Sequence, residues 1–264
     1  MSTLTDEVVV TVIENSIATV TINRPQALNV LNTSMLQELK AFFLDNIRNN
    51  PDVKAVVITG QGEKAFCGGA DIKEMKSMDA HQATIYSQLG QQVVAAIEDT
   101  PKPVISAVNG YAFGGGLELV MACDIVIASE NARFASPEIN VGVMTGWGGS
   151  KRLPEIIGPA RAKELLFTGE AIDAQTALML GIVNRVVPAG RLIEEALSLA
   201  RLLAAKPPIA LALAKRTVNH CRYVDRESAA MMEAESFGAC FQTADRKEGM
   251  AAFAEKRTPV FTGK

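Results

Sequence analysis

Short β-branched runs alternate with amphipathic stretches through the first two thirds of the chain. The runs Val53–Thr59, Pro103–Val108 and Asp124–Ser129 are almost continuously apolar, which is typical of strands that are buried on both faces. The stretches between them place apolar residues at helical spacing. Because strands and helices alternate, the sequence predicts an α/β fold with a largely parallel sheet.

The beginning of the chain adds a hairpin and a helix to this pattern. The runs Val8–Ile13 and Ala18–Ile22 are separated by residues typical of a turn, so they predict paired strands. Apolar residues at helical spacing predict a helix from about Met35 to Arg48, with Thr33 or Ser34 as its N-cap.

From about residue 191 the pattern changes to helices alone. We therefore divide the chain into a core over residues 1–200, which carries the candidate site, and a C-terminal helical region over residues 201–264. The helices expected here are Arg191–Ala205, Pro208–Cys221, Arg226–Thr243 and Asp245–Glu255.

The side-chain inventory excludes several kinds of site. Of 264 residues only 2 are His and 4 are Cys. The two histidines, His81 and His220, are too far apart in sequence to form a local zinc motif, so no metal site is expected. The cysteines form no C-x-x-C pair, and we expect reduced thiols. The net charge of −3 offers no basic surface for nucleic acid.

The sequence contains no recognisable targeting or membrane segment. Residues Met1–Glu7 have neither the basic nor the apolar region of a secretory leader. No apolar run reaches the ~18 residues that a bilayer-spanning helix needs. We therefore expect a cytoplasmic protein without a membrane partner.

Two glycine clusters, Phe66–Ile72 and Asn109–Glu118, each follow an expected strand and precede an expected helix. Glycine allows the backbone to approach a ligand closely, and a helix N-terminus offers unpaired N–H groups. Two such ends that face one point would form a two-donor oxyanion hole. The alternative is that the glycines serve close helix packing alone. Neither cluster fits a P-loop or a dinucleotide-binding motif.

Two glutamates lie in apolar sequence surroundings. Glu118 is part of Gly-Leu-Glu-Leu-Val-Met, so its helix is expected to be buried and the pKa of its carboxyl raised. Glu138 follows Pro137 between apolar neighbours. The alternatives are a structural salt bridge for Glu118 and a solvated loop charge for Glu138. Near an oxyanion hole, the pair would suit general acid–base chemistry beside a carbonyl.

Taken together, these blocks resemble the crotonase superfamily and, within it, the enoyl-CoA hydratases. The similarity extends from Asn23 to Arg257 and is most specific over Ala65–Met75, Asn109–Asp124 and Phe134–Pro154. It implies a crotonase-like spiral of repeated ββα units with a C-terminal helical trimerisation region. It also implies a homotrimer, or a homohexamer of two stacked trimers.

The resemblance further implies an acyl-CoA thioester substrate and no cofactor besides the CoA that the substrate carries. The N–H groups of Ala70 and Gly115 would hold the thioester oxygen. Glu118 would help to activate a water for attack on the β-carbon, and Glu138 would deliver a proton to the α-carbon. The other positions implied to contact CoA or the acyl group are Gln26, Leu28, Asp71, Ile72, Lys73, Trp147, Phe253 and Lys256.

Two of these positions have open alternatives. Trp147 either closes the acyl pocket or packs in the core. Lys256 either meets a phosphate of CoA bound in a neighbouring subunit or is an ordinary solvated lysine.

The reaction expected from the resemblance is the reversible syn addition of water across the 2,3 double bond of a trans-2-enoyl-CoA, giving a 3-hydroxyacyl-CoA, as in fatty acid β-oxidation. Other reactions of the same fold stay open: a branched-chain or methylglutaconyl-CoA hydratase, or an enoyl-CoA isomerase. A non-catalytic CoA-binding assembly protein is disfavoured because both glutamates are present. The preferred acyl length stays open.

Some members of the superfamily bind RNA through a lysine-rich helix. The corresponding helix, Met35–Arg48, has only Lys40 and Arg48 as cations, against Glu38 and Asp45. It therefore lacks a basic stripe, and RNA binding is disfavoured.

Overall fold

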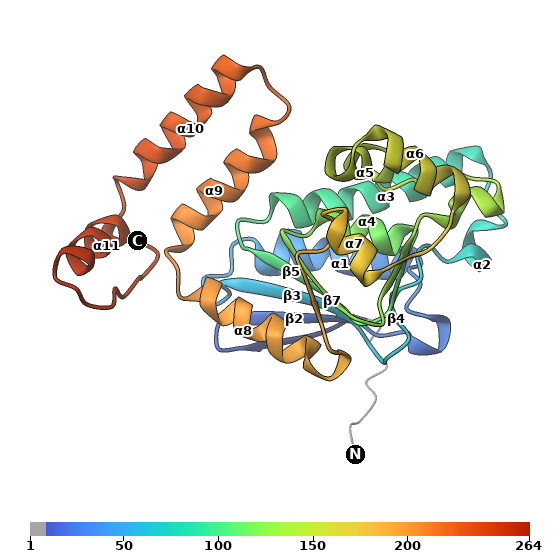
Figure 1. Ribbon diagram of the computed structural model, residues 1–264, viewed down its shortest axis with the longest axis horizontal. Coiled ribbons are helices and arrows are strands. Elements are labelled where there is room, and N and C mark those ends of the chain that lie inside the picture. Colours follow the sequence, from blue (N-terminus) through green and yellow to red (C-terminus); the bar gives the residue numbers. More distant parts are fainter. Residues whose placement is uncertain (1–8) are drawn as a thin grey trace.

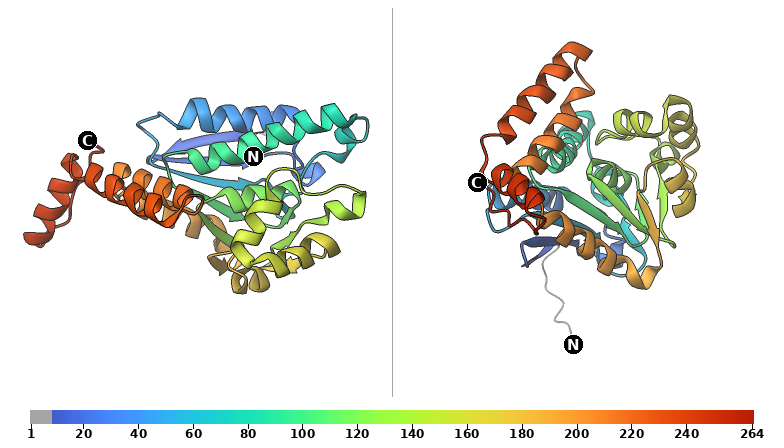
Figure 2. Two further views of the ribbon diagram at one scale, coloured as in Figure 1. Left: turned by 90° about the horizontal axis from the view of Figure 1, so that it is seen from above. Right: turned by 60° about the vertical axis from the view of Figure 1, so that its left-hand side comes forward.

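The structure, a computed structural model, describes residues 9–264 (Figure 1). Val8, where the first strand is expected to begin, and Met1–Glu7, where no leader is expected, lie outside the described residues. The described chain forms a body of two sheets covered by helices, from which the last helices project (Figures 1 and 2).

The larger sheet has six strands in the order β1-β2-β3-β5-β7-β10. Its first pair is the expected hairpin, whose turn residues Asn15 and Ser16 have φ of 50° and 63°. All later neighbours run parallel, as the sequence predicts. The strands are β1 (Val9–Glu14), β2 (Ile17–Ile22), β3 (Ala55–Gly60), β5 (Val104–Val108), β7 (Ile125–Ser129) and β10 (Arg185–Val187).

This sheet has an apolar core on each face, because successive residues of a strand point to opposite sides. In β3, Val56 and Ile58 belong to one core, whereas Ala55 and Val57 pack against α8 (Leu192–Ala204). The first core lies beneath the helices α1 (Thr33–Ala41), α3 (Ala80–Asp99) and α4 (Gly115–Ala122). Burial on both faces explains why the strands are nearly continuous apolar runs.

A second sheet of four short strands lies beside the first, in the order β4-β6-β8-β9. Three of its strands, β4 (Ala65–Cys67), β6 (Tyr111–Phe113) and β8 (Arg133–Ala135), are not among the strands that the sequence predicts. Three residues are too few to show a periodicity, and only partners distant in sequence make them strands. The fourth strand is β9 (Ile172–Asp173). The segments that follow β4, β6 and β8 carry both glycine clusters and Glu138.

The first helix differs from its prediction at both ends. It begins at Thr33, but the N-cap is Asn32, whose side chain accepts a hydrogen bond from Met35 N (3.0 Å). Thr33 instead donates its hydroxyl to Glu74 (2.6 Å). The expected single helix to Arg48 is two elements, α1 (Thr33–Ala41) and a π-helix, η2 (Phe42–Ile47).

The body contains further helices besides α1, η2 and α8. The prediction of a helix at the end of each glycine cluster is confirmed, since α2 begins at the last residue of the first cluster and α4 begins within the second. The remaining helices of the body are η1 (Pro25–Ala27), α2 (Ile72–Met75), α3 (Ala80–Asp99), α4 (Gly115–Ala122), η3 (Pro137–Val141), α5 (Gly149–Ile157), α6 (Pro159–Thr168), α7 (Ala174–Met179) and η4 (Ala189–Arg191).

Three helices form an arm that extends away from the body (Figure 2, left). They are α9 (Pro208–Cys221), α10 (Arg226–Cys240) and α11 (Ala244–Ala254). Thr243, expected at the end of α10, is instead the N-cap of α11 and accepts a hydrogen bond from Arg246 N (3.1 Å). The predicted boundary at residue 200 falls inside α8, which packs on the sheet, and the boundary itself stays a prediction.

Within residues 9–264 no single helix is long and apolar enough to cross a membrane. The segments Ala189–Ala204 and Pro208–Cys221 reach the necessary length and composition only together, with a bend of 108° between them. The same part of the chain contains no group of three or more His, Cys, Asp or Glu side chains that could hold a metal ion. All four cysteines are free.

Candidate active site

A cavity of about 820 Å³ opens between α3 and the segments that follow β4, β6 and β8. Its wall brings together predicted site residues that are far apart in sequence, such as Ala70 and Trp147, which are separated by 77 positions. The predicted residues that line it are Ala70, Ile72, Gly115, Glu118, Glu138 and Trp147.

The two glycine clusters meet at this cavity. Gly69 has φ of 103°, and a Cβ there would lie 2.9 Å from Phe113 O and 3.4 Å from Gly115 N. Only glycine fits a backbone of this shape and this close to its neighbour. The segment around Ala70 therefore lies directly against the N-terminus of α4.

Two backbone N–H groups at this junction are available for a ligand. Gly115 is the first residue of α4, so its N–H has no acceptor within the helix. The amides of Gly69 and Asp71 bond to Cys67 Sγ and Leu31 O, whereas Ala70 N–H between them makes no such bond to any described residue. Two donors at one point can stabilise a negative charge that develops on a carbonyl oxygen.

Glu118 lies on α4 and is only 2% exposed. Its Oε1 accepts hydrogen bonds from Trp147 N (2.7 Å), Gly149 N (2.7 Å) and the hydroxyl of Thr145. Burial raises the pKa of Glu118, and these three donors act against that rise. Glu118 forms no salt bridge with any residue of the described chain, so neutral donors, not a cation, hold its carboxylate.

Glu138 lies in the first turn of η3, beside Gly114, the N-cap residue of α4. Its Oε2 is buried and has no hydrogen-bond partner among residues 9–264. Burial, reinforced by the negative charge of Glu118, raises the pKa of Glu138 to about 7. The side chain is therefore not a solvated loop charge, and near neutral pH it exists in both protonation states.

Trp147 is 3% exposed and lies between α3 and α4. Any Cβ at Gly90 or at Gly115 would overlap the indole, so both glycines make room for the ring. Tyr86 packs against it with ring centroids 5.9 Å apart and donates its hydroxyl to Leu31 O (2.7 Å). The indole thus packs in the core and lines the cavity at the same time.

The segment Asp71–Lys73 has mixed roles. Asp71 is buried, forms an ion pair with Arg24 (2.7 Å) and caps α2 by accepting from Lys73 N (3.0 Å). Ile72 is 51% exposed and contributes to the cavity wall, while the Lys73 side chain is exposed.

The other predicted ligand contacts lie outside the cavity wall. Gln26 and Leu28 are exposed in the loop around η1, which meets the first glycine cluster through Gly68 N and Leu28 O (2.8 Å). Phe253, in α11, is 88% exposed, and Lys256 follows that helix. Figure 1 shows α11 at the opposite end of the molecule from α2. These two residues therefore do not reach the cavity of their own chain.

The three donors that bind Glu118, which together form its cradle, were not predicted from the sequence. Thr145 and the amides of Trp147 and Gly149 come from the segment before α5. A Cβ at Gly149 would meet both Thr145 and Glu118 Oε1, so this glycine is required. The signal available was the run of glycines at 146, 148 and 149.

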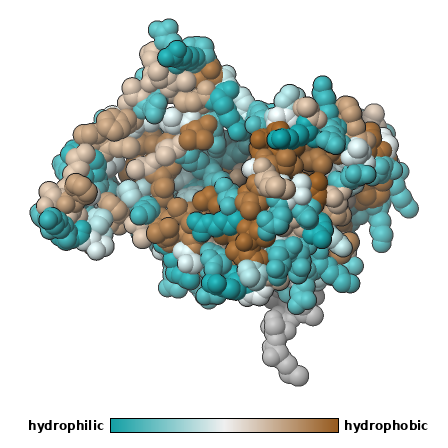
Figure 3. Space-filling model, viewed as in Figure 1, coloured by the Kyte–Doolittle hydropathy of each residue, from teal (hydrophilic) through white to brown (hydrophobic). Residues whose placement is uncertain are grey.

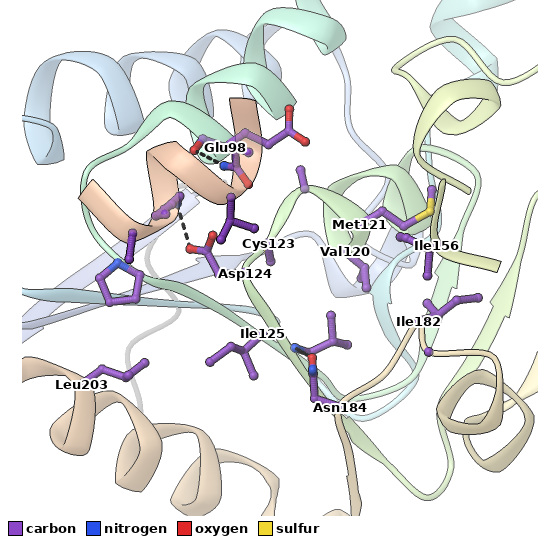
Figure 4. Close-up of a pocket in the computed structure, with 18 of the residues that line it drawn as sticks. Glu98, Val120, Met121, Cys123, Asp124, Ile125, Ile156, Ile182, Asn184 and Leu203 are labelled. Atoms are coloured by element: carbon purple, nitrogen blue, oxygen red, sulfur yellow. Dashed lines mark hydrogen bonds and ion pairs between the residues drawn. The ribbon is translucent and has the colours of Figure 1, made fainter. Parts of the chain in front are cut away.

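A second cavity, of about 460 Å³, lies between the body and α9. Figure 4 shows Glu98 and Asp124 at one end and Met121 with Ile156 at the other. Lys215 of α9 forms an ion pair with Asp124 (2.8 Å), which attaches the arm to the body. Because this cavity contains neither glutamate of the pair nor the free amides, it is not the candidate active site.

Comparison with known proteins agrees with this geometry. The sequence profile described as enoyl-CoA hydratase/isomerase matches residues 12–264. The chain belongs to the enoyl-CoA hydratase/isomerase family. The crotonase resemblance found in the sequence is thereby confirmed, and with it the predicted crotonase-like fold.

Individual relatives of the family are similar along almost their whole length. A short-chain-enoyl-CoA hydratase of Clostridium acetobutylicum is 45% identical over 92% of this chain and 93% of its own. A crotonyl-CoA hydratase of Syntrophomonas wolfei is 43% identical over 95% and 96%. The crystal structure of an enoyl-CoA hydratase from Bacillus anthracis superposes with a TM-score of 0.94 at 38% identity, covering 98% of this chain and 100% of the other.

Proposed function

We propose that this chain is an enoyl-CoA hydratase, which adds water reversibly and syn across the 2,3 double bond of a trans-2-enoyl-CoA. The observation that carries the proposal is a pair of glutamates in unlike environments on one cavity. Glu118 is held by three donors, whereas Glu138 has a pKa of about 7 and an oxygen without a partner in the described part of the chain. Two carboxyl groups whose environments differ in this way suit a base and an acid.

The proposed mechanism uses both glutamates and the two free amides. Ala70 N–H and Gly115 N–H bind the thioester oxygen and stabilise the enolate-like charge, where one such donor is typically worth ~3–4 kcal/mol. Glu118 takes a proton from a water molecule while the oxygen of that water bonds to the β-carbon. Protonated Glu138 gives its proton to the α-carbon. Proton exchange with solvent then restores both groups, and no cofactor besides the CoA of the substrate takes part.

The preferred acyl group in this proposal is short. Trp147 lies against Gly115, where the thioester oxygen would bind, so the indole limits the space beyond that point. The similar proteins of Clostridium acetobutylicum and Syntrophomonas wolfei carry the names short-chain-enoyl-CoA and crotonyl-CoA hydratase, which supports the same acyl length.

The test is a panel of trans-2-enoyl-CoA thioesters of increasing chain length and branching. Loss of the absorbance of the conjugated thioester reports hydration, and kcat/KM should be highest for the four-carbon substrate. No loss with any member of the panel would refute the proposal. Conversion of a 3-enoyl-CoA into a 2-enoyl-CoA without hydration would instead identify an isomerase.

Replacing Trp147 with phenylalanine should relax the chain-length limit. The smaller ring leaves space between α3 and α4, and each accommodated methylene is worth about 1–3 kcal/mol of discrimination. We expect the ratio of kcat/KM for an eight-carbon over a four-carbon substrate to rise about tenfold. An unchanged ratio would mean that Trp147 packs without limiting the acyl chain.

We also propose that the arm assembles the chain into a homotrimer or homohexamer. Large apolar side chains are exposed along it, among them Met231 (59%), Phe237 (66%) and Phe253 (88%). Figure 3 shows brown and tan residues along this arm. Apolar exposure on this scale is typical of surfaces that bind protein, and contact with a neighbouring chain would bring Phe253 and Lys256 toward that chain's CoA.

The replacement Phe237→Asp should weaken this assembly, because it places a charge in an apolar contact. Light scattering of the unaltered chain is expected to give the mass of three or six chains, and of the variant a smaller mass. The matched change Glu233→Asp, at an exposed acidic position of the same helix, should leave the mass unaltered. A monomeric unaltered chain would contradict the proposal.

A further inference from the structure

Arg152 is a buried cation that the proposed mechanism does not use. It lies on α5 and is 6% exposed. Its Nε and Nη2 donate to the two oxygens of Glu98 on α3, at 2.8 and 2.5 Å. Its Nη1 donates to Trp147 O at 3.1 Å. A buried guanidinium with its fork satisfied in this way has a defined orientation.

The peptide chain at Trp147 connects this cation to the candidate base. Trp147 N–H donates to Glu118 Oε1, while Trp147 O accepts from Arg152. Gly148 has φ of 104°, and a Cβ there would overlap Arg152 Nη1. Glycine is therefore needed for the backbone to turn around the guanidinium and still present the amides of Trp147 and Gly149 to Glu118.

The charge of Arg152 also acts on Glu118. Although the two groups make no direct bond, the positive charge lowers the pKa of Glu118 against the effect of burial. The charged groups that face this region are Glu138 of η3, Glu98 of α3, and Arg222 beyond α9. Of these, Glu98 partly neutralises Arg152, and Arg222 lies 4.0 Å from Glu98.

We infer that Arg152 is a positioning residue for Glu118, and that Glu98 in turn orients Arg152. The guanidinium holds the Trp147 carbonyl so that the segment 145–149 directs its three donors at one carboxylate oxygen. This inference rests on the proposed function, because it assigns a supporting residue to the same reaction. Arg152 itself lies outside the wall of the active-site cavity.

A lysine cannot replace this arginine fully. Its ammonium group lacks the planar fork that joins two carboxylate oxygens and a carbonyl at once. Lysine does keep the positive charge, so Arg152→Lys should retain the electrostatic effect and lose part of the orientation. Arg152→Met removes both effects and retains an unbranched side chain.

The experiment compares Arg152→Met, Arg152→Lys and Glu98→Gln with Lys151→Gln. Lys151 is the exposed neighbour of Arg152 on the same helix, so its replacement removes one charge without touching the segment 145–149. We expect kcat to fall about 100-fold in Arg152→Met, the size typical of a small misplacement of a reacting group. KM should change little, Arg152→Lys should recover part of the rate, and Lys151→Gln should match the unaltered protein.

The pH profile separates positioning from simple structural damage. Glu118 must be ionised to act as a base, so the rate falls at low pH as this carboxylate is protonated. Without Arg152 the pKa of Glu118 rises, and the acid limb of kcat/KM should move to higher pH in Arg152→Met but not in Arg152→Lys. Structural damage alone would reduce the rate equally at every pH.

A second readout does not depend on activity. Trp147 is the single tryptophan, so its fluorescence reports the segment that Arg152 holds. Arg152→Met should increase quenching by acrylamide, and Lys151→Gln should not. A kcat within about threefold of the unaltered protein, or a loss without movement of the acid limb, would overturn the inference. An inactive unaltered protein with the expected quenching pattern would instead contradict only the proposed function.

Discussion

Replacing Glu118 with glutamine is expected to lower kcat for hydration by about 10²–10⁴-fold, the usual contribution of a positioned acid–base group. Glutamine has nearly the same shape, and its amide oxygen can still accept from Trp147 N and Gly149 N. The variant should therefore fold and bind an enoyl-CoA. It cannot take a proton from water, so the loss should appear in kcat with little change in KM.

The measurement is the hydration rate of a four-carbon enoyl-CoA at saturating concentration. The matched control is Glu164→Gln, which makes the same chemical change at an exposed position of α6 and should leave the rate unaltered. A Glu118→Gln variant with more than about a tenth of the normal kcat would remove Glu118 from the proposed role of base.

Replacing Glu138 with glutamine is expected to have an effect of the same size, about 10²–10⁴-fold in kcat. The reason differs, since Glu138 has to carry a proton that it can release. Its buried Oε2 has no partner among the described residues, and a neutral amide there would keep the shape without supplying a proton to the α-carbon. Normal hydration by this variant would require another proton donor.

The pH dependence gives Glu138 a distinct signature. Its pKa is raised to about 7, so the carboxyl is protonated below that pH and ionised above it. The acid form is needed for hydration, and kcat/KM should therefore decline as the pH rises through about 7. Dehydration should show the same alkaline limb in kcat/KM, because the overall reaction releases no proton.

In Glu138→Gln this alkaline limb should be absent from the residual rate, while the acid limb due to Glu118 should remain. Rate measurements over a pH range that extends to both sides of 7 test the alkaline limb, and their extension to lower pH tests the acid limb. A limb near neutral pH that persists in the variant would assign that titration to another group.

The large sheet was predictable because its strands are buried on both faces. Continuous apolar runs such as those in β3 and β5 can be recognised from neighbouring residues alone, and in the fold every residue of these two strands is buried. The burial of Glu118 was predictable for a related reason, since every face of its helix is apolar in sequence and the carboxylate is only 2% exposed in the fold.

The second sheet and the Glu118 cradle were not predictable from local sequence. Strands of three residues, such as β6, exist only because β4 and β8 supply their hydrogen bonds. Likewise Thr145 approaches Glu118 only because the chain folds back between these two residues, which are 27 positions apart in sequence. The cap of the first helix shows the same limit, because Thr33 is engaged by Glu74 and leaves Asn32 as the N-cap.

The sequence by itself determined the class of fold, the family and which two glutamates are the candidates. Burial pattern and residue type can be recognised from short stretches of sequence. Only the tertiary structure decided that Glu118 is held by three donors while one oxygen of Glu138 has no partner within residues 9–264. The pKa of a carboxyl depends on its solvation and on the donors around it. Those neighbours come from segments far apart in the chain, so the difference on which the proposed division into base and acid rests follows from packing.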